Sequence, residues 1–376
     1  MKILDKVAML AAVLLVASCA QRDITVTTNV RGDGSCVRTV TFKGDSSILV
    51  GAVCSDEKGA LLSLSDWEKS WSIDNGKSLH PYPMSSAQYD SLAQELASGG
   101  YNKSPSDTVL LSAVRRFGSV ESMAALQPLQ IDGVQLEARG SFDKKFRWFY
   151  TYYTFNETYG ALKNKYPLPM EDYVKPEVAS YWFTGSPNLM QGYTPLESKD
   201  KLDAMQTDVE RWLSACWMAL CCDVVASHYL KITDAPVNKD SFVHNRNALL
   251  EYSLQKGLEV TNNSLSFIDE YYSCNAFTKS LKDDSLFEDE LDNRCQFLFD
   301  VAALDARYNL IMPGTVIDAG NGAVVDGVVE YHLTGSRLIP HSYTISATSR
   351  QLNAWAVVVA VLLLLAAGWV IIRKRK

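Results

Sequence analysis

The sequence predicts an α+β protein in which a membrane-proximal antiparallel β domain carries two helical insertions and is followed by one transmembrane helix. Three observations support this fold class. Alternating apolar and polar residues near both ends of the chain are typical of half-buried strands, residues 160–306 have apolar residues at helical spacing, and residues 354–372 form an uncharged apolar segment. We predict a β domain over 19–159 and 307–350, with its helical insertion at about 57–127, and a helical lobe over 160–306.

Residues 1–18 have the pattern of an export signal. Lys2 and Lys6 precede an apolar run over residues 7–16, as in the central region of secretory signals. The run ends in Val16-Ala17-Ser18-Cys19, which resembles the lipobox of bacterial lipoproteins. We therefore expect Cys19 to carry lipid, palmitate included, and to become the mature N-terminus. An ordinary signal cleaved after Ala20 and an uncleaved anchor are the alternatives.

Three strands are expected next. Residues 24–30 and 36–42 alternate with period two around a turn at 31–34, and residues 48–53 are a short apolar run. Cys36 and Cys54 then lie on neighbouring strands and are a possible disulfide, provided that their Cα atoms lie within about 7 Å. Seven cysteines follow Cys19, so at least one stays unpaired.

The segment over 61–126 has helical spacing, including residues 109–117, and strands return over 129–142 and 145–158 around a turn at Asp143-Lys144. The second of these strands is dense in aromatic and β-branched residues, which favour strands. Its Trp148, Tyr150 and Tyr152 are possible ligand-binding aromatics for a sugar or a lipid. Burial in the core is the alternative for such a strand.

Residues 160–306 are expected to be helical. Apolar residues recur every three or four positions over 202–220, and 242–258 and 281–306 have similar patterns. Cys216, Cys221 and Cys222 share one of these helices, and we expect buried thiols there rather than a metal site. Strands are then expected around 315–318 and 343–347, with hairpin turns signalled by Asn321-Gly322 and Asp326-Gly327.

The end of the chain predicts a membrane span. Residues 354–372 are long enough to cross a hydrocarbon core of ~30 Å, Trp355 and Trp369 lie near the two ends, and the basic tail 373–376 follows. The positive-inside tendency places this tail in the cytoplasm. We therefore expect a cytoplasmic (inner) membrane protein with the bulk of its chain periplasmic, or extracytoplasmic in a single-membrane envelope. With Cys19 also at the membrane, the first and last strands should run in opposite directions within one membrane-proximal sheet.

The net charge of the chain limits the classes of binding partner that we expect. The formal net charge is −7, and because the signal segment contributes +1 and the tail +4, the region between them carries −12. A body of that sign is repelled by phosphate backbones, so nucleic acid is not expected as a partner. We do expect membrane lipid as a partner, together with a lipid, glycan or protein partner in the envelope.

Several of these segments together resemble one family. The lipobox, the early strand pair, the stretch Met312-Pro313-Gly314-Thr315-Val316, the stretch Gly327-Val328-Val329-Glu330-Tyr331 and the basic-tailed span are similar to the LppM family of membrane-anchored lipoproteins. The resemblance covers about a third of the chain and leaves 55–305 unmatched. It implies a small β domain at the membrane with a lipid- or glycolipid-binding role and no catalytic residues.

Signatures of catalysis are missing from the sequence. The five histidines form no His-Glu-x-x-His or His-x-His pair, and there is no Gly-x-Ser-x-Gly elbow or phosphate-binding glycine loop. Gly44-Asp45-Ser46 lacks the partners of a hydrolase motif and suits a turn. We therefore expect a non-enzymatic protein with no catalytic residue, metal or cofactor. The alternatives are an envelope hydrolase or transferase with a site between the β domain and the helical lobe, and an accessory subunit of a membrane complex.

Overall fold

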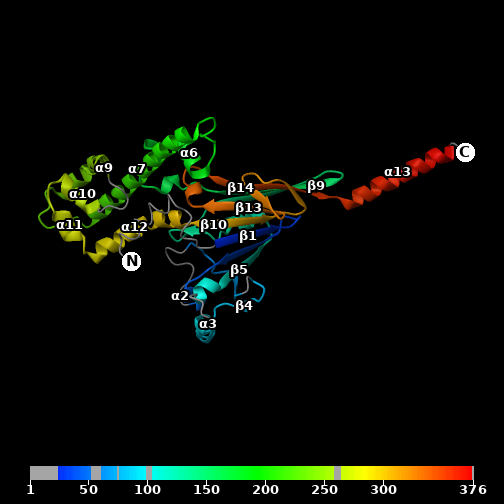
Figure 1. Cartoon of the computed structure of the whole chain (residues 1–376), viewed down its shortest axis with the longest axis horizontal. Helices are drawn as coiled ribbons and strands as arrows, with labels where there is room; N and C mark the ends of the chain where they lie inside the picture. Colours follow the sequence, from blue (N-terminus) through cyan, green and yellow to red (C-terminus); the bar gives the residue numbers. More distant parts are fainter. Residues whose placement is uncertain (1–23, 52–60, 74–75, 99–103, 258–263, 375–376) are drawn as a thin grey trace.

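The computed structural model describes residues 24–51, 61–73, 76–98, 104–257 and 264–374. Two β-sheets pack face to face in the middle of the molecule, a helical lobe extends from one end, and a single helix projects from the other (Figure 1). The α+β fold class is therefore confirmed, together with the C-terminal apolar helix.

The larger sheet has eight strands, and the first strand of the chain lies near its middle. Its pairs are antiparallel except that β1 and β10 run parallel, which the sequence did not predict. The parallel pair arises because the chain returns from the helical lobe at the same end at which β1 begins. In order across the sheet the strands are β12 (Ala323–Val325), β13 (Val328–Thr334), β10 (Asp305–Ile311), β1 (Ile24–Val30), β2 (Cys36–Phe42), β5 (Leu110–Phe117), β3 (Glu68–Ser72) and β4 (His80–Pro81).

The smaller sheet is antiparallel and has one buried and one solvent-facing side. Every second residue of its central strands is buried against the larger sheet, as Phe155 and Ile345 are, which is the period expected for a sheet with one wet face. A separate two-stranded ribbon, β6 (Gln130–Ile131) and β7 (Val134–Gln135), precedes it. The four strands in order are β11 (Thr315–Asp318), β14 (Tyr343–Leu352), β9 (Tyr150–Tyr159) and β8 (Ala138–Phe146).

Helix α7 (Pro195–Ser227) is the axis of the helical lobe and spans ~50 Å at 1.5 Å per residue. A capping box between Thr194 and Glu197 begins it. The predicted apolar stripe is confirmed from Met205 onward, with Val209 and Trp212 also buried, whereas Leu202 at its start is exposed. Around it lie α6 (Pro176–Thr184), α8 (Lys239–His244), α9 (Arg246–Gln255), α10 (Ser264–Tyr271), α11 (Ala276–Leu281), α12 (Ser285–Ala303) and the 3₁₀ turns η1 (Lys163–Lys165), η2 (Met170–Asp172) and η3 (Tyr229–Lys231).

Element predictions before residue 120 are wrong at two places, and the segment expected to be helical over 61–126 also contributes β3 and β4 to the larger sheet. Where a strand was expected from residue 48, the chain forms the short helix α2 (Ser46–Leu49), which begins where the Asp45 side chain accepts the backbone N–H of Ile48, while residues 52–53 lie outside the described residues. The expected helix over 109–117 is the strand β5, because residues spaced by four lie on one face of a strand as well as of a helix. The remaining helices of this region are α3 (Ser86–Ser98), α4 (Pro105–Thr108) and α5 (Val120–Ala125).

The hairpin of β8 and β9 turns four residues later than predicted. Phe146 pairs with Thr151, so the connection is 147–149 rather than Asp143-Lys144. Asp143, Lys144 and Lys145 look like a turn in sequence, but they occupy an edge strand, where charged residues protect the open edge from pairing with another chain. The later hairpin signal at Asp326-Gly327 is confirmed between β12 and β13, with positive φ at both residues.

The predicted relation between the first and last strands is also wrong. β1 lies in the larger sheet and β14 in the smaller one. Both strands run toward the C-terminal helix. Thr28 of β1 lies level with Glu157 of β9. Gly32, which follows β1, approaches the hydroxyl of Tyr153, which lies nearer to the C-terminal helix and donates to Gln351. Ile24 therefore lies at the end of β1 that is farther from the C-terminal helix.

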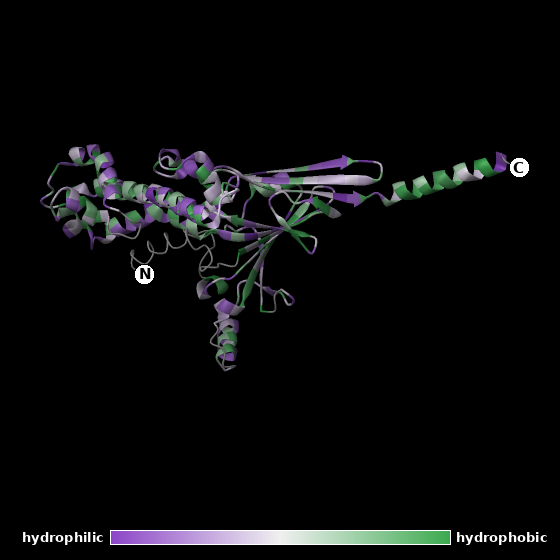
Figure 2. Ribbon diagram, turned by 45° about the horizontal axis from the view of Figure 1, so that its top comes forward, coloured by the Kyte–Doolittle hydropathy of each residue, from purple (hydrophilic) through white to green (hydrophobic). Residues whose placement is uncertain are grey.

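Helix α13 (Ala354–Lys374) leaves the body directly after β14 and is exposed along its length. Figure 2 shows α13 mostly in the colour of hydrophobic residues, whereas the helices of the lobe mix hydrophobic and hydrophilic residues. Within the described part of the chain it alone is long and apolar enough to cross a membrane. A short 3₁₀ turn, η4 (Ser336–Leu338), precedes β14.

Candidate functional site

The tip of the β8–β9 hairpin is fastened to the start of α13 by one side chain. The amide nitrogen of Asn353 donates to the carbonyls of Arg147 at 2.8 Å and Trp148 at 3.2 Å, and its oxygen accepts the hydroxyl of Thr151 at 2.8 Å. Its backbone N–H also donates to the carbonyl of Phe149. The hairpin tip and the apolar helix therefore meet through a saturated hydrogen-bond junction.

Aromatic rings gather at this junction, on the side of the smaller sheet that faces the larger one. Phe146 stacks on Trp355 with ring centres 6.1 Å apart, and Trp148 packs edge-on against the same ring at 5.4 Å. About half of each side chain remains exposed, at 56%, 51% and 49% for Phe146, Trp355 and Trp148. Exposed Trp and Phe beside an apolar helix are typical of a membrane–water interface.

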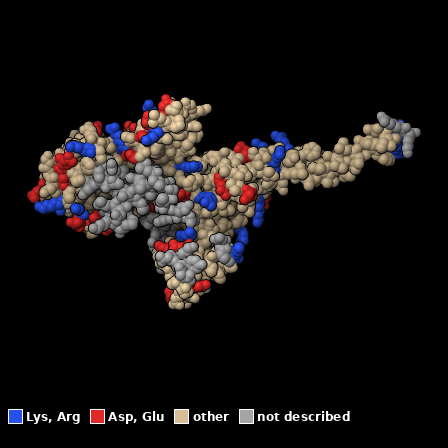
Figure 3. Space-filling model, in the orientation of Figure 1, with Lys and Arg blue, Asp and Glu red and all other residues tan. Residues whose placement is uncertain are grey.

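Basic side chains lie at the same junction, on the opposite side of the smaller sheet. On the solvent-facing side of the smaller sheet, Lys145 and Arg350 lie opposite Tyr152 from its two neighbouring strands. The guanidinium of Arg350 lies 5.0 Å from the ring centre of Tyr150, which is cation–π geometry. Neither cation forms an ion pair with a carboxylate of the described chain. Figure 3 shows Lys and Arg side chains around the base of α13.

We call this region the hairpin-tip surface and define it by Lys145, Phe146, Trp148, Tyr150, Tyr152, Arg350 and Trp355. It contains the three aromatics that the sequence singled out. Trp148, Tyr150 and Tyr152 all avoid the core, whereas Tyr153 and Phe155 of the same strand are buried. Sequence reasoning missed Phe146, Trp355, Lys145 and Arg350 as members of the surface. Trp355 carried a signal, as a tryptophan at the start of a predicted span, but the register that brings Lys145 and Arg350 beside Tyr152 carried none.

The predicted lipidation site and half of the predicted disulfide cannot be placed. Cys19 and Cys54 lie outside the described residues, so lipidation and the Cys36–Cys54 pairing stay predictions. Cys36 is buried in β2 with its thiol directed at the carbonyl of Ser119, and burial raises its pKa to about 11.

A buried ion pair joins the two sheets. Arg38 of β2 and Glu157 of β9 form two parallel hydrogen bonds of 3.1 and 2.6 Å, and neither side chain is exposed. Tyr308 donates to the same carboxylate, and Thr28 and Gln127 complete the network. Burial raises the pKa of Glu157, but the Arg38 charge and these hydrogen bonds outweigh it and leave the pKa below its ordinary value. Enclosed on all sides, the network is a structural cross-link between the sheets.

A serine–histidine pair lies where the helical lobe meets the smaller sheet. The Ser180 hydroxyl is 3.1 Å from Nε2 of His341, whose Nδ1 lies 3.0 Å from the Ser342 carbonyl. The hydroxyl is closer to the Ser186 carbonyl, at 2.6 Å, which takes its single proton. This contact fastens the end of α6 (Pro176–Thr184) rather than activating a nucleophile.

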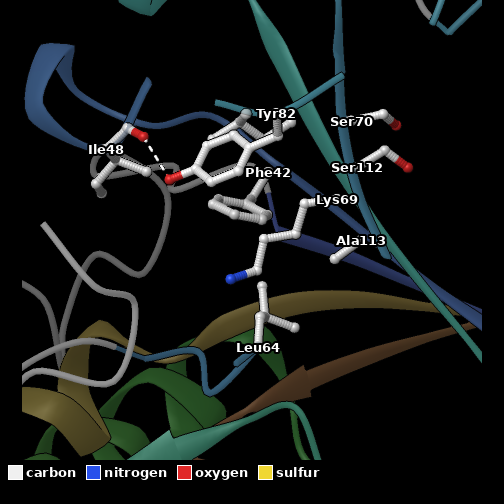
Figure 4. Close-up of a pocket in the computed structure, with 9 residues that line it drawn as sticks. Phe42, Ile48, Leu64, Lys69, Ser70, Tyr82, Ser112 and Ala113 are labelled. Atoms are coloured by element: carbon white, nitrogen blue, oxygen red, sulfur yellow. Dashed lines mark hydrogen bonds between the residues drawn. The ribbon is translucent and has the colours of Figure 1, made fainter. Parts of the chain in front are cut away.

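Hollows in the described part of the molecule offer little chemistry. An open recess of about 640 Å³ near the same junction has Glu137 and Arg139 as its charged lining. A second cavity of about 20 Å³, room for one water, is mostly apolar, and Tyr82 at its edge donates to the Ile48 carbonyl (Figure 4). No cluster of metal-ligating side chains occurs among the residues that the structure describes.

The three cysteines of α7 are buried, as predicted, whereas Cys274 elsewhere in the helical lobe is partly exposed. Cys216, Cys221 and Cys222 lie in the core, together with Cys295 of α12. Burial raises the pKa of Cys216, Cys221 and Cys295 to about 12, which is the behaviour of inert thiols.

No protein-family model, curated protein or solved structure matches the chain.

Proposed function

We propose that this chain is a non-enzymatic cell-envelope lipoprotein that binds membrane lipid at the periplasmic face of the cytoplasmic membrane, using the hairpin-tip surface. The observation that carries the proposal is the exposed cluster of Phe146, Trp148 and Trp355 at the base of α13. Exposing large aromatic side chains to water costs free energy, whereas Trp and Phe side chains are stable at the interface between a bilayer and water.

The position of the cluster supports the proposal. Trp355 is the second residue of α13, so a span that begins at Ala354 places Trp355 at headgroup depth, and the stacked Phe146 and Trp148 follow it there. The basic tail after residue 372 favours an extracytoplasmic body. The predicted lipid on Cys19 and the resemblance to the LppM family, which implies a lipid-binding role, agree with this assignment.

The alternatives have weaker support. A hydrolase at the junction of the β domain and the helical lobe needs converging titratable groups, and the recess there offers Glu137 and Arg139 alone as charged lining. A glycan needs an open aromatic platform, and Trp148 is edge-on against Trp355 instead. An accessory-subunit role predicts loss of assembly when α13 is exchanged for an unrelated span.

Fluorescence quenching tests the proposal. The full chain is reconstituted into nanodiscs of zwitterionic phosphatidylcholine brominated near the headgroup end of the acyl chains. We expect Trp148→Phe to remove a strongly quenched component, because Trp148 lies within the range of the bromines. Trp182→Phe, on α6 in the helical lobe, should remove an unquenched component. If the two variants change quenching alike, the hairpin tip lies outside the interface and the proposal fails.

A further inference from the structure

Charges on the solvent-facing side of the smaller sheet are sorted into rows. Lys145, Tyr152 and Arg350 form one row across β8, β9 and β14. The next row, two residues farther from α13, has Asp143 opposite Thr154, and Asp318 opposite Thr348. The rows lie ~7 Å apart. Positive charge is thus concentrated nearest the apolar helix, and negative charge is set behind it.

This arrangement is unusual for the body as a whole. The region between the signal and the tail carries −12, yet four cations, Lys144, Lys145, Arg147 and Arg350, lie within a few residues of the hairpin tip. Lys163 and Lys231, by contrast, form ion pairs on the helical lobe. Lys145 and Arg350 form none with the carboxylates that the structure describes, and they stay available to an external anion.

The geometry points to a binding site for the phosphate of an anionic phospholipid headgroup between Lys145 and Arg350, over Tyr152. Directly opposite positions on neighbouring strands lie ~5 Å apart, so one phosphate can contact both cations and the Tyr152 hydroxyl. Arg offers a planar donor fork for phosphate oxygens, and Lys a point charge. The inference rests on the proposed function, since Phe146, Trp148 and Trp355 bring the row to headgroup depth.

The source of the phosphate follows from the same rows. The carboxylates of Asp143 and Asp318 lie behind the cations, on the side away from α13. An anion approaching from that side meets negative charge first, whereas one approaching from the side of α13 meets Lys145 and Arg350. A headgroup in the membrane that surrounds α13 has the favourable approach.

Lipid retention tests this site. The full chain is placed in nanodiscs of equal parts phosphatidylglycerol and phosphatidylcholine, and the lipids that stay bound are counted by native mass spectrometry. We expect the wild type to retain phosphatidylglycerol in preference. Lys145→Ala with Arg350→Ala should lower that preference by about fivefold for each cation removed. The matched control, Lys239→Ala with Arg294→Ala on the helical lobe, removes the same charge and should leave it unchanged.

Two further measurements separate the outcomes. Asp143→Asn with Asp318→Asn keeps both cations and should raise the preference, so the test does not depend on the alanine variant folding. Inorganic phosphate that binds the wild type in phosphatidylcholine nanodiscs, but not the alanine variant, would assign the site to a free anion and overturn the headgroup assignment. Equal retention of both lipids by the wild type also overturns it. Quenching at Trp148 that persists in that case leaves the proposed function standing.

Discussion

The guanidinium of Arg38 and the carboxylate of Glu157 lie 2.6 Å apart at their closest atoms, in the interior where the two sheets meet. The residues are 119 positions apart in the chain. Such a pair contributes little net stability against an apolar replacement, but removing one partner leaves the other charge buried and unpaired. The pair therefore makes correct packing of the smaller sheet on the larger one a condition of folding.

Removing one partner should be severe. We expect Glu157→Ala to lower the free energy of unfolding by about 3–5 kcal/mol, because Arg38 is then buried without a counter-charge. Denaturant unfolding of the full chain in detergent micelles measures the change. Replacing both, Arg38→Met with Glu157→Leu, should recover most of the loss. Glu171→Ala, which breaks the exposed Lys163–Glu171 pair, should cost no more than about 1 kcal/mol.

The same pair should make stability depend on pH. The pKa of Glu157 in the folded protein lies below its ordinary value of 4.5, so the ionised carboxylate stabilises the fold above that pH. This contribution is lost as the pH falls below 4.5 toward the folded-state pKa, because the unfolded chain then binds a proton first. Unfolding free energies between pH 6 and 3 should fall less steeply in the Arg38→Met, Glu157→Leu variant, by up to the slope of one proton. Equal slopes would contradict the assignment.

The junction at Asn353 should control the order of the hairpin tip. Asn353→Ala removes three side-chain hydrogen bonds, to Arg147, Trp148 and Thr151, so we expect the tip to open more often. Hydrogen exchange of residues 146–152 in nanodiscs should accelerate about tenfold, for a loss of about 1.4 kcal/mol in the local opening free energy. Asn156→Ala, which removes one 3.3 Å bond to Ser141, is the control and should change exchange little.

The buried lobe cysteines should resist alkylation. Thiols with a pKa of about 12, as at Cys216, Cys221 and Cys295, are about one part in ten thousand thiolate at pH 8, and they are shielded as well. Among the lobe cysteines we expect iodoacetamide to label Cys274 first, because it is partly exposed, and the four buried thiols, Cys222 included, only after unfolding. Peptide mass mapping reads out the order. Early labelling of Cys216 would show that the lobe opens easily.

The sequence predicted elements whose pattern had one explanation. The alternation over 24–30 and 36–42 and the apolar stripe of α7 are as expected. The strand β5 was missed because its apolar residues, four apart, fit both periods. Pairing between distant segments left no local signal, so neither the Arg38–Glu157 pair nor the Lys145–Tyr152–Arg350 row could be found. What sequence offered for the site was its aromatic residues, not the cations beside them.

The direction of β1 decides how a doubly tethered body can rest. Thr28 of β1 is level with Glu157 of β9, which is seven residues from Tyr150 at the hairpin tip. Ile24 is four residues farther from the tip than Thr28, so the distance along the strands from Ile24 to the tip is roughly 36 Å. The five residue steps from Cys19 to Ile24 cover at most ~18 Å. With lipid on Cys19 and α13 in one bilayer, the strands must recline to within ~30° of the membrane plane. An upright stalk is excluded for such a molecule, because the far end of β1 then lies no more than ~18 Å above the lipid surface.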